Sequence, residues 1–83
     1  MKLYIVVIDY RSEEASTIRG VFSTRELAVE EVRHYCDIRY SQKTILQCCE
    51  EFGCDPNKGY FCSEEENVSI TEKTLDYVYR GCS

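Results

Sequence analysis

The sequence predicts a small α+β protein, in which an antiparallel sheet of three or four strands packs against one kinked helix or two successive helices. Three observations predict this class: an unbroken apolar run near the start, an alternating stretch after it, and two amphipathic helical patterns in the middle of the chain. The expected order of elements is β-β-α-α-β-β. A chain of 83 residues supports one modest core, so we expect residues 1–83 to form a single domain.

Residues 3–8 are all apolar and rich in β-branched side chains. This is typical of a strand that is covered on both faces, or nearly so, and is therefore central in its sheet. After a polar stretch, residues 16–22 alternate, with Ile18 and Phe22 on one side. We expect an antiparallel hairpin with a loop of about five to seven residues. Gly20 inside the second strand indicates a bulge, or a close approach of the helix.

A helix is expected over residues 24–39. Ser23 and Glu26 have the Ser-x-x-Glu spacing of a capping box, in which each side chain accepts a hydrogen bond from the backbone N–H of the other residue. Phe22 and Leu27 have the positions of a hydrophobic staple, which sets the direction of the chain into the helix. These signals predict where the helix starts and do not bear on chemistry.

A second helical pattern begins at Ser41, and its apolar arc is rotated by roughly a quarter turn from that of the first helix. A break near Tyr40 and Ser41 would bring both arcs to the core, and Gly53 is suited to end the second helix. The apolar arc of the first helix is expected to consist of Leu27, Ala28, Val32, Tyr35, Cys36 and Ile38.

Residues 55–59 have the composition of a turn. Residues 60–62 are expected to form a short strand, and residues 64–67 a solvated turn. Residues 68–75 are rich in Val, Ile and Thr, which predicts a strand. A helix over residues 69–80 is the competing interpretation, since a second capping-box spacing occurs there.

Residues 18–28 read Ile-Arg-Gly-Val-Phe-Ser-Thr-Arg-Glu-Leu-Ala, and residues 70–76 read Ile-Thr-Glu-Lys-Thr-Leu-Asp. This combination resembles small uncharacterised proteins of bacteriophages and bacteria, in which a hairpin ends in Gly-Val-Phe-Ser-Thr, enters a helix, and is followed by an Ile-x-Glu-x-x-Leu-Asp strand. The resemblance covers residues 2–36 and 68–76. It implies a β-β-α-β core and implies no catalytic residues.

Residues 40–66 depart from that pattern as a cysteine-rich insertion, which holds four of the six cysteines. Thiolates are ligands for tetrahedral zinc, so zinc is the one cofactor that this composition suggests. The alternatives are free thiols in the core, or a disulfide such as one between Cys54 and Cys62. The candidate metal ligands are Cys49, Cys54, Cys62 and, as a fourth, Cys36 or Cys48.

The formal net charge is −5, which argues against direct binding of nucleic acid through a basic stripe. Acidic clusters suit a basic protein partner, and tyrosine is favoured at interfaces because it combines an apolar ring with a polar hydroxyl. The candidate partner-binding residues are Tyr60, Glu64, Glu65, Glu66, Tyr77 and Tyr79.

The single histidine, His34, is expected on the polar side of the first helix, paired with Glu30 rather than in a catalytic cleft. The sequence offers no phosphate-binding glycine loop and no serine–histidine–aspartate set, so we do not expect an enzyme. The apolar run at the start is too short to span a membrane, and no membrane partner is expected.

The leading expectation is a non-enzymatic accessory protein of the phage or mobile-element type, which binds another protein and inhibits a host or defence factor. It would act in the cytoplasm, which is the host cytoplasm for a phage-encoded chain. One alternative is a zinc- or disulfide-stabilised structural module, including a homo-oligomer. Another is a protein that sequesters a small ligand such as a nucleotide, which the acidic net charge disfavours.

Overall fold

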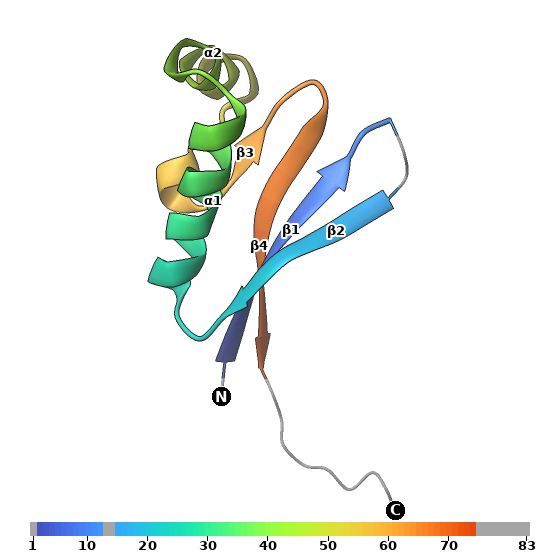
Figure 1. The fold of residues 1–83 in the computed structure, drawn as a ribbon, viewed down its shortest axis with the longest axis vertical. Coiled ribbons are helices and arrows are strands. Elements are labelled where there is room, and N and C mark those ends of the chain that lie inside the picture. The colour runs from blue at the N-terminus through green and yellow to red at the C-terminus, as the bar shows by residue number, and fades with distance from the viewer. Residues whose placement is uncertain (1, 13–14, 75–83) are drawn as a thin grey trace, which may run out of the picture.

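A computed structural model describes residues 2–12 and 15–74 of the chain. They form a four-stranded antiparallel sheet in the order β2-β1-β4-β3, with two helices, which confirms the predicted α+β class and element order (Figure 1). In chain order the elements are β1 (Lys2–Tyr10), β2 (Ala15–Phe22), α1 (Arg25–Arg39), α2 (Gln42–Phe52), the 3-10 helix η1 (Pro56–Lys58), β3 (Phe61–Cys62) and β4 (Glu66–Thr74).

β1 is central in the sheet, as its apolar run predicts, because it pairs with β2 on one edge and with β4 on the other. Tyr10 of β1 pairs with Ala15 of β2. The hairpin connection therefore spans residues 11–14 and is shorter than predicted. The strands extend past their apolar runs into polar residues such as Asp9, which pairs with Ser16, and this shortens the loop.

The two faces of the sheet differ in burial. On the face that α1 covers, Val6 and Ile8 of β1 and Val68 of β4 are buried against Ala28 and Val32 of α1. On the other face, which we call the open face, the side chains are half-buried or exposed. The prediction that β1 is covered on both faces is therefore wrong within the described residues. The apolar residues of the open face are Leu3, Ile5, Val7, Ile18 and Val21.

The pairing of β1 with β2 shifts by one residue at Arg19 and Gly20, which confirms the predicted bulge. The extra residue reverses the alternation of side chains beyond it. Ile18 therefore lies on the open face, where it is 62% exposed, while Phe22 packs against the core on the covered face. The prediction that these two residues share one side is wrong for this reason.

The bulge directs Arg19 toward α1. Its Nε lies 2.8 Å from Oε2 of Glu31, and its guanidinium carbon lies 5.1 Å from the ring centre of Tyr35. A bulge thus joins the edge strand to the covering helix by an ion pair and a cation–π contact.

α1 begins one residue later than predicted. Its N-cap is Thr24, whose Oγ1 accepts a hydrogen bond from the backbone N–H of Leu27 at 3.3 Å. The predicted capping box of Ser23 and Glu26 is therefore wrong, because Ser23 lies before the cap. Leu27 is 46% exposed, which does not fit a packed staple with Phe22.

The predicted break between the two helices is confirmed at Tyr40, whose φ of −131° and ψ of 152° are extended. Ser41 caps α2 by accepting the N–H of Thr44 at 3.2 Å, and Gly53 ends α2 in the left-handed conformation with a φ of 67°. Ile38, which was expected on the apolar arc, is 63% exposed in the last turn of α1, so this part of the prediction is wrong.

The strand prediction for residues 68–75 is confirmed as far as Thr74, and the competing helix is wrong over that part. The remaining positions lie outside the described residues. Glu66 and Asn67 begin β4, so the solvated turn predicted there is shorter, and Glu66 is fully buried. Phe61 of the predicted short strand is also fully buried, with its ring centre 5.2 Å from that of Tyr40.

Candidate functional site

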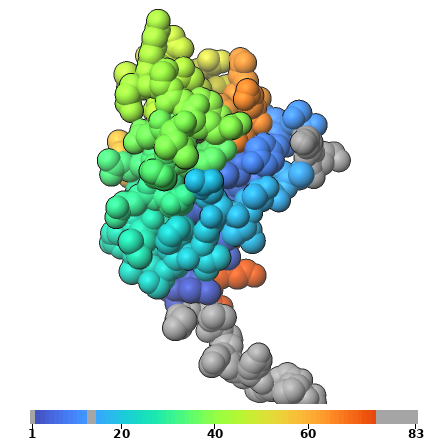
Figure 2. All heavy atoms as spheres, viewed as in Figure 1, coloured from blue at the N-terminus to red at the C-terminus, as the bar shows by residue number. Residues whose placement is uncertain are grey.

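A groove lies between α2 and the turn that joins β3 to β4, within the predicted insertion of residues 40–66. Figure 2 shows the atoms of this turn (orange) beside those of α2 (yellow-green) at the top of the molecule. The groove has a volume of about 290 Å³. We call it the acidic groove. Its half-buried floor consists of Tyr40, Cys48 and Phe52, and its exposed rim carries Glu51, Glu64 and Glu65.

The α2 side of the groove is placed by the caps of the helix. With Ser41 at the start and Gly53 at the end, Cys48, Glu51 and Phe52 come to adjacent positions on one side of α2. From the sequence, the apolar arc of α2 was expected to face only the core. The spacing of three and four residues between these side chains was the signal that could have identified a second, partly exposed stripe.

The turn side of the groove is organised by Ser63. Its Oγ accepts hydrogen bonds from the backbone N–H groups of Glu65 and Glu66, each at 3.2 Å. Its own backbone N–H donates to the carbonyl of Glu66 at 2.9 Å. A buried serine therefore holds the turn closed, and the side chains of Glu64 and Glu65 remain exposed at the rim.

Carboxylates dominate the charge of the groove. The described residues that line it include three glutamates and no lysine or arginine. Glu50 adds a further carboxylate in an adjoining hollow. Burial raises the pKa of the Cys48 thiol, and nearby Cys54, Glu51 and Glu64 raise it further, so this thiol is neutral at physiological pH.

Two arginines lie on the far side of the turn, where they line a separate hollow with Glu64 and Glu65. Arg11 places its guanidinium carbon 5.5 Å from the ring centre of Phe52 and donates to Asn67 at 3.0 Å. Arg39 donates a hydrogen bond to the carboxylate of Glu66. The ring of Phe52 thus already accepts one guanidinium, which shows that this aromatic surface suits a cation.

Glu66 does not belong to the exposed surface, and its prediction as a partner-binding residue is wrong. Its side chain is fully buried and accepts hydrogen bonds from Tyr35 at 2.7 Å, from Arg39 at 2.7 Å and from Tyr40. Three donors compensate for the lost hydration of the carboxylate. The sequence shows Glu64, Glu65 and Glu66 as one acidic run, but the start of β4 turns the third toward the core.

The hydrogen bonds to Glu66 also set protonation states. Burial acts to raise the pKa of Glu66, but the hydrogen bonds from Tyr40, Tyr35 and Arg39 outweigh it and lower the pKa. Burial and the hydrogen bond to Glu66 raise the pKa of Tyr40 to about 12. The tyrosine therefore remains a donor and the glutamate remains charged, directly beneath the floor of the acidic groove.

Of the three predicted tyrosines, Tyr60 lies within the described residues and away from the groove. Tyr60 is 41% exposed, but it lies at a bridge with Asp55 and is not among the groove's lining residues. Tyr77 and Tyr79 lie outside the described residues. The structure thus brings together Glu64 and Glu65 with side chains of α2 that were not predicted as a site.

Three of the predicted metal ligands, Cys36, Cys49 and Cys54, line one cavity of about 430 Å³ between the helices and η1. The sulfur atoms of Cys49 and Cys54 are 3.9 Å apart, and Cys54 Sγ lies 3.7 Å from the backbone oxygen of Cys62. Within residues 2–12 and 15–74, no three acidic, histidine or cysteine side chains have a metal-binding arrangement. Zinc binding therefore stays a prediction.

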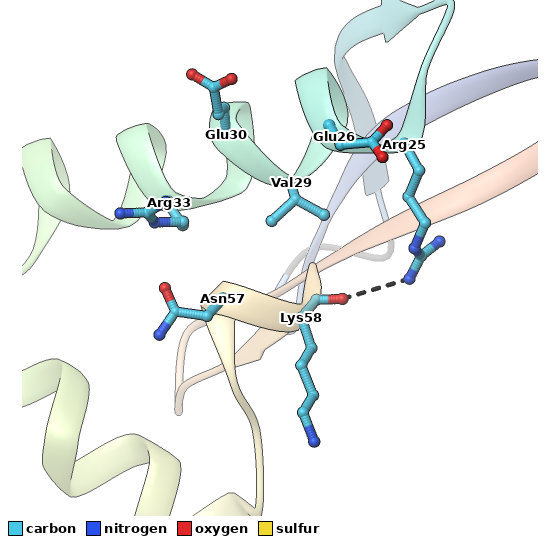
Figure 3. Close-up of a pocket in the computed structure, with 7 residues that line it drawn as sticks. All are labelled: Arg25, Glu26, Val29, Glu30, Arg33, Asn57 and Lys58. Atoms are coloured by element: carbon cyan, nitrogen blue, oxygen red, sulfur yellow. Dashed lines mark hydrogen bonds between the residues drawn. The ribbon is translucent and has the colours of Figure 1, made fainter.

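A wider groove lies between α1 and η1, with a volume of about 650 Å³ (Figure 3). Its charges are mixed: Arg25, Arg33 and Lys58 oppose Glu26 and Glu30. Arg25 donates a hydrogen bond to the backbone oxygen of Lys58 at 3.3 Å. Three cationic and two anionic side chains leave only a small excess of positive charge, and nucleotide binding stays a prediction.

In the described part of the chain, no helix has the length and apolar character needed to cross a membrane. His34 is exposed on α1, as predicted. Comparison of the sequence and the fold with protein-family models, curated proteins and solved structures finds no match.

Proposed function

We propose that this chain is a non-enzymatic protein-binding module and that its acidic groove binds a basic, partly apolar segment of another protein. The observation that carries the proposal is the composition of the groove, in which a half-buried apolar floor is bordered by three exposed carboxylates and by no cation among its lining residues. Charge complementarity with lysine or arginine would raise the association rate and exclude acidic partners.

The dimensions of the groove support a side-chain anchor. Small-molecule sites usually have volumes of about 300–1,000 Å³, and the acidic groove lies at the lower limit of that range at about 290 Å³. Its floor offers Phe52 and Tyr40, and aromatic side chains contribute strongly to interface energies. An aliphatic or arginine side chain from the partner could lie on this floor while neighbouring cations meet Glu51, Glu64 and Glu65.

The protonation of the thiols supports a binding role over a catalytic one. Nucleophilic cysteines need a lowered pKa. Burial raises the pKa of Cys36 to about 12 and that of Cys49 to about 11, with nearby carboxylates also contributing. These groups are neutral thiols near pH 7, unlike the activated thiolates of catalytic cysteines.

Within this proposal, the chain acts as an accessory protein of a phage or mobile element and inhibits a host or defence factor in the cytoplasm. The support is the resemblance of residues 2–36 and 68–76 to small phage and bacterial proteins, together with a surface suited to a basic protein.

The test uses a defined probe, a ten-residue peptide of alternating lysine and leucine or phenylalanine, titrated into isotope-labelled protein and followed by NMR. We expect shifts concentrated at Cys48, Glu51 and Glu65. The double variant Glu51→Lys/Glu64→Lys should lose roughly tenfold in affinity, which corresponds to about 1.4 kcal/mol.

The matched control is Glu26→Lys/Glu30→Lys, which makes the same change in net charge at the groove of mixed charge in Figure 3. This control should lower the affinity for the peptide by less than about twofold, through long-range electrostatic interactions alone. Equal weakening by both double variants would show non-specific attraction and contradict the assignment of the acidic groove.

A further inference from the structure

Cys49 and Cys54 are brought together by the way in which α2 ends. Gly53 adopts a φ of 67°, and its backbone N–H donates to the carbonyl of Cys49 at 3.0 Å. This is the left-handed C-cap, in which the residues that follow the glycine return to the last turn of the helix. Cys54 follows directly, and its Sγ lies 3.9 Å from that of Cys49.

The turn after Cys54 holds it in this place. Asp55 donates its backbone N–H to Tyr60 at 3.1 Å, and its side chain accepts the N–H of Asn57 at 3.0 Å. Pro56 and Gly59 of the same turn are buried. Cys54 itself is 5% exposed. The hydrogen bonds and burial of this turn therefore fix the position of Cys54 next to Cys49.

This pair is distinguished from the other cysteines of the described residues. Cys48 lines the acidic groove, away from the cavity that Cys49 and Cys54 share. Cys62 approaches Cys54 through its backbone oxygen, and Cys36 is almost fully buried on α1. The Sγ atoms of Cys49 and Cys54 are in hydrogen-bond contact at 3.9 Å.

We propose that Cys49 and Cys54 are a modification site, at which a disulfide oxidant such as oxidised glutathione forms an intramolecular disulfide. The half-buried Cys49 loses its proton, and its thiolate attacks a sulfur of the oxidant, which forms a mixed disulfide and releases one glutathione thiolate. The thiolate of Cys54 then attacks the Cys49 sulfur and displaces the second. Two protein thiols are oxidised, one oxidant disulfide is reduced to two thiols, and the two protons pass to these leaving groups.

The disulfide between Cys49 and Cys54 would link the end of α2 to the η1 turn. This end of α2 carries Glu51 and Phe52 of the acidic groove.

The experiment incubates the full chain with oxidised glutathione and analyses its tryptic peptides by mass spectrometry. Cleavage after Lys43 and Lys58 isolates residues 44–58, which contain Cys48, Cys49 and Cys54. In the variant Cys48→Ser, only the proposed pair remains in this peptide, and we expect it to lose the mass of two hydrogen atoms. In the reciprocal variant Cys49→Ser, the mass of this peptide should not change on oxidation.

Because Cys49→Ser could alter folding, circular dichroism is recorded for each variant, and the wild-type protein is also mapped by alkylation of free thiols before and after oxidation. Protection of Cys49 and Cys54 together, with Cys48 still alkylated, supports the proposal. Absence of the internal disulfide in Cys48→Ser at every oxidant concentration would overturn it, as would pairing of Cys54 with Cys62.

Discussion

The two faces of the sheet use similar residues with different consequences. On the covered face, Val6 and Ile8 are buried against α1. On the open face, Val7 is half-buried, and Ile18 and Val21 of β2 are 62% and 52% exposed. All five belong to strands of one sheet, and only their position relative to α1 distinguishes them. Burial, rather than residue type, therefore determines what a β-branched side chain contributes to stability.

The same distinction separates the glutamates of the β3–β4 turn. Glu64 and Glu65 are exposed at the acidic groove, while Glu66 is on the covered side and accepts three hydrogen bonds in the core. Identical side chains at adjacent positions thus have different roles: two contribute to the charge of a surface, and the third links α1 to β4. This contrast can be tested by matched substitutions.

The largest effect is expected for Glu66→Ala, which should lower the free energy of unfolding by about 3 kcal/mol, because Tyr35 and Tyr40 lose a buried acceptor. Arg39 loses its partner as well, but its side chain is 45% exposed and can be hydrated. Chemical denaturation measures the change. Glu65→Ala is the control and should stay within about 0.5 kcal/mol. Similar losses from both variants would show that the turn, rather than the buried carboxylate, is responsible.

The pair Val6→Ala and Val7→Ala compares the two faces directly at adjacent positions of β1. Val6→Ala should cost about 2 kcal/mol, since it removes two methyl groups from a fully buried site. Val7→Ala should cost less than about 1 kcal/mol, because its side chain is only half-buried. Thermal or urea denaturation of both variants provides the measurement. Equal costs would indicate that the open face is covered in solution.

Acidification should remove the stabilisation that the buried Glu66 carboxylate contributes. The pKa of Glu66 is lowered in the folded protein relative to its ordinary value near 4.3, so its contribution to stability is complete above that value and is lost as the pH falls through the folded pKa. When urea midpoints are measured from pH 7 to pH 2, they should decrease as the pH falls below the ordinary pKa of glutamate. The Glu66→Gln variant should show a shallower fall, and an identical pH dependence in both proteins would contradict the assignment.

The smallest of these effects concerns the start of α1, the helix that covers the sheet. Thr24→Ala should cost about 1 kcal/mol through loss of the acceptor for the Leu27 N–H. Ser23→Ala should leave the denaturation midpoint nearly unchanged, because Ser23 lies before the cap. A larger cost for Ser23→Ala than for Thr24→Ala would instead support the capping box that the sequence spacing predicts.

Local signals in the sequence determined much of the fold. The apolar run predicted β1, and helical periodicity from Ser41 with a cap at Gly53 predicted α2 and its separation from α1 at Tyr40. Gly20 marked the bulge. These features depend mainly on residues a few positions apart, so short stretches of sequence are enough to predict them.

The tertiary structure decided which side chains meet across the fold. Ile18 reaches the open face only because the bulge shifts the strand register, and Glu66 is buried only because Tyr35 and Arg39, far earlier in the chain, supply its donors. The acidic groove likewise needs α2 and the β3–β4 turn side by side. Periodicity in a sequence specifies a face, but not its neighbour, because burial and charge compensation depend on residues that only the folded chain brings together.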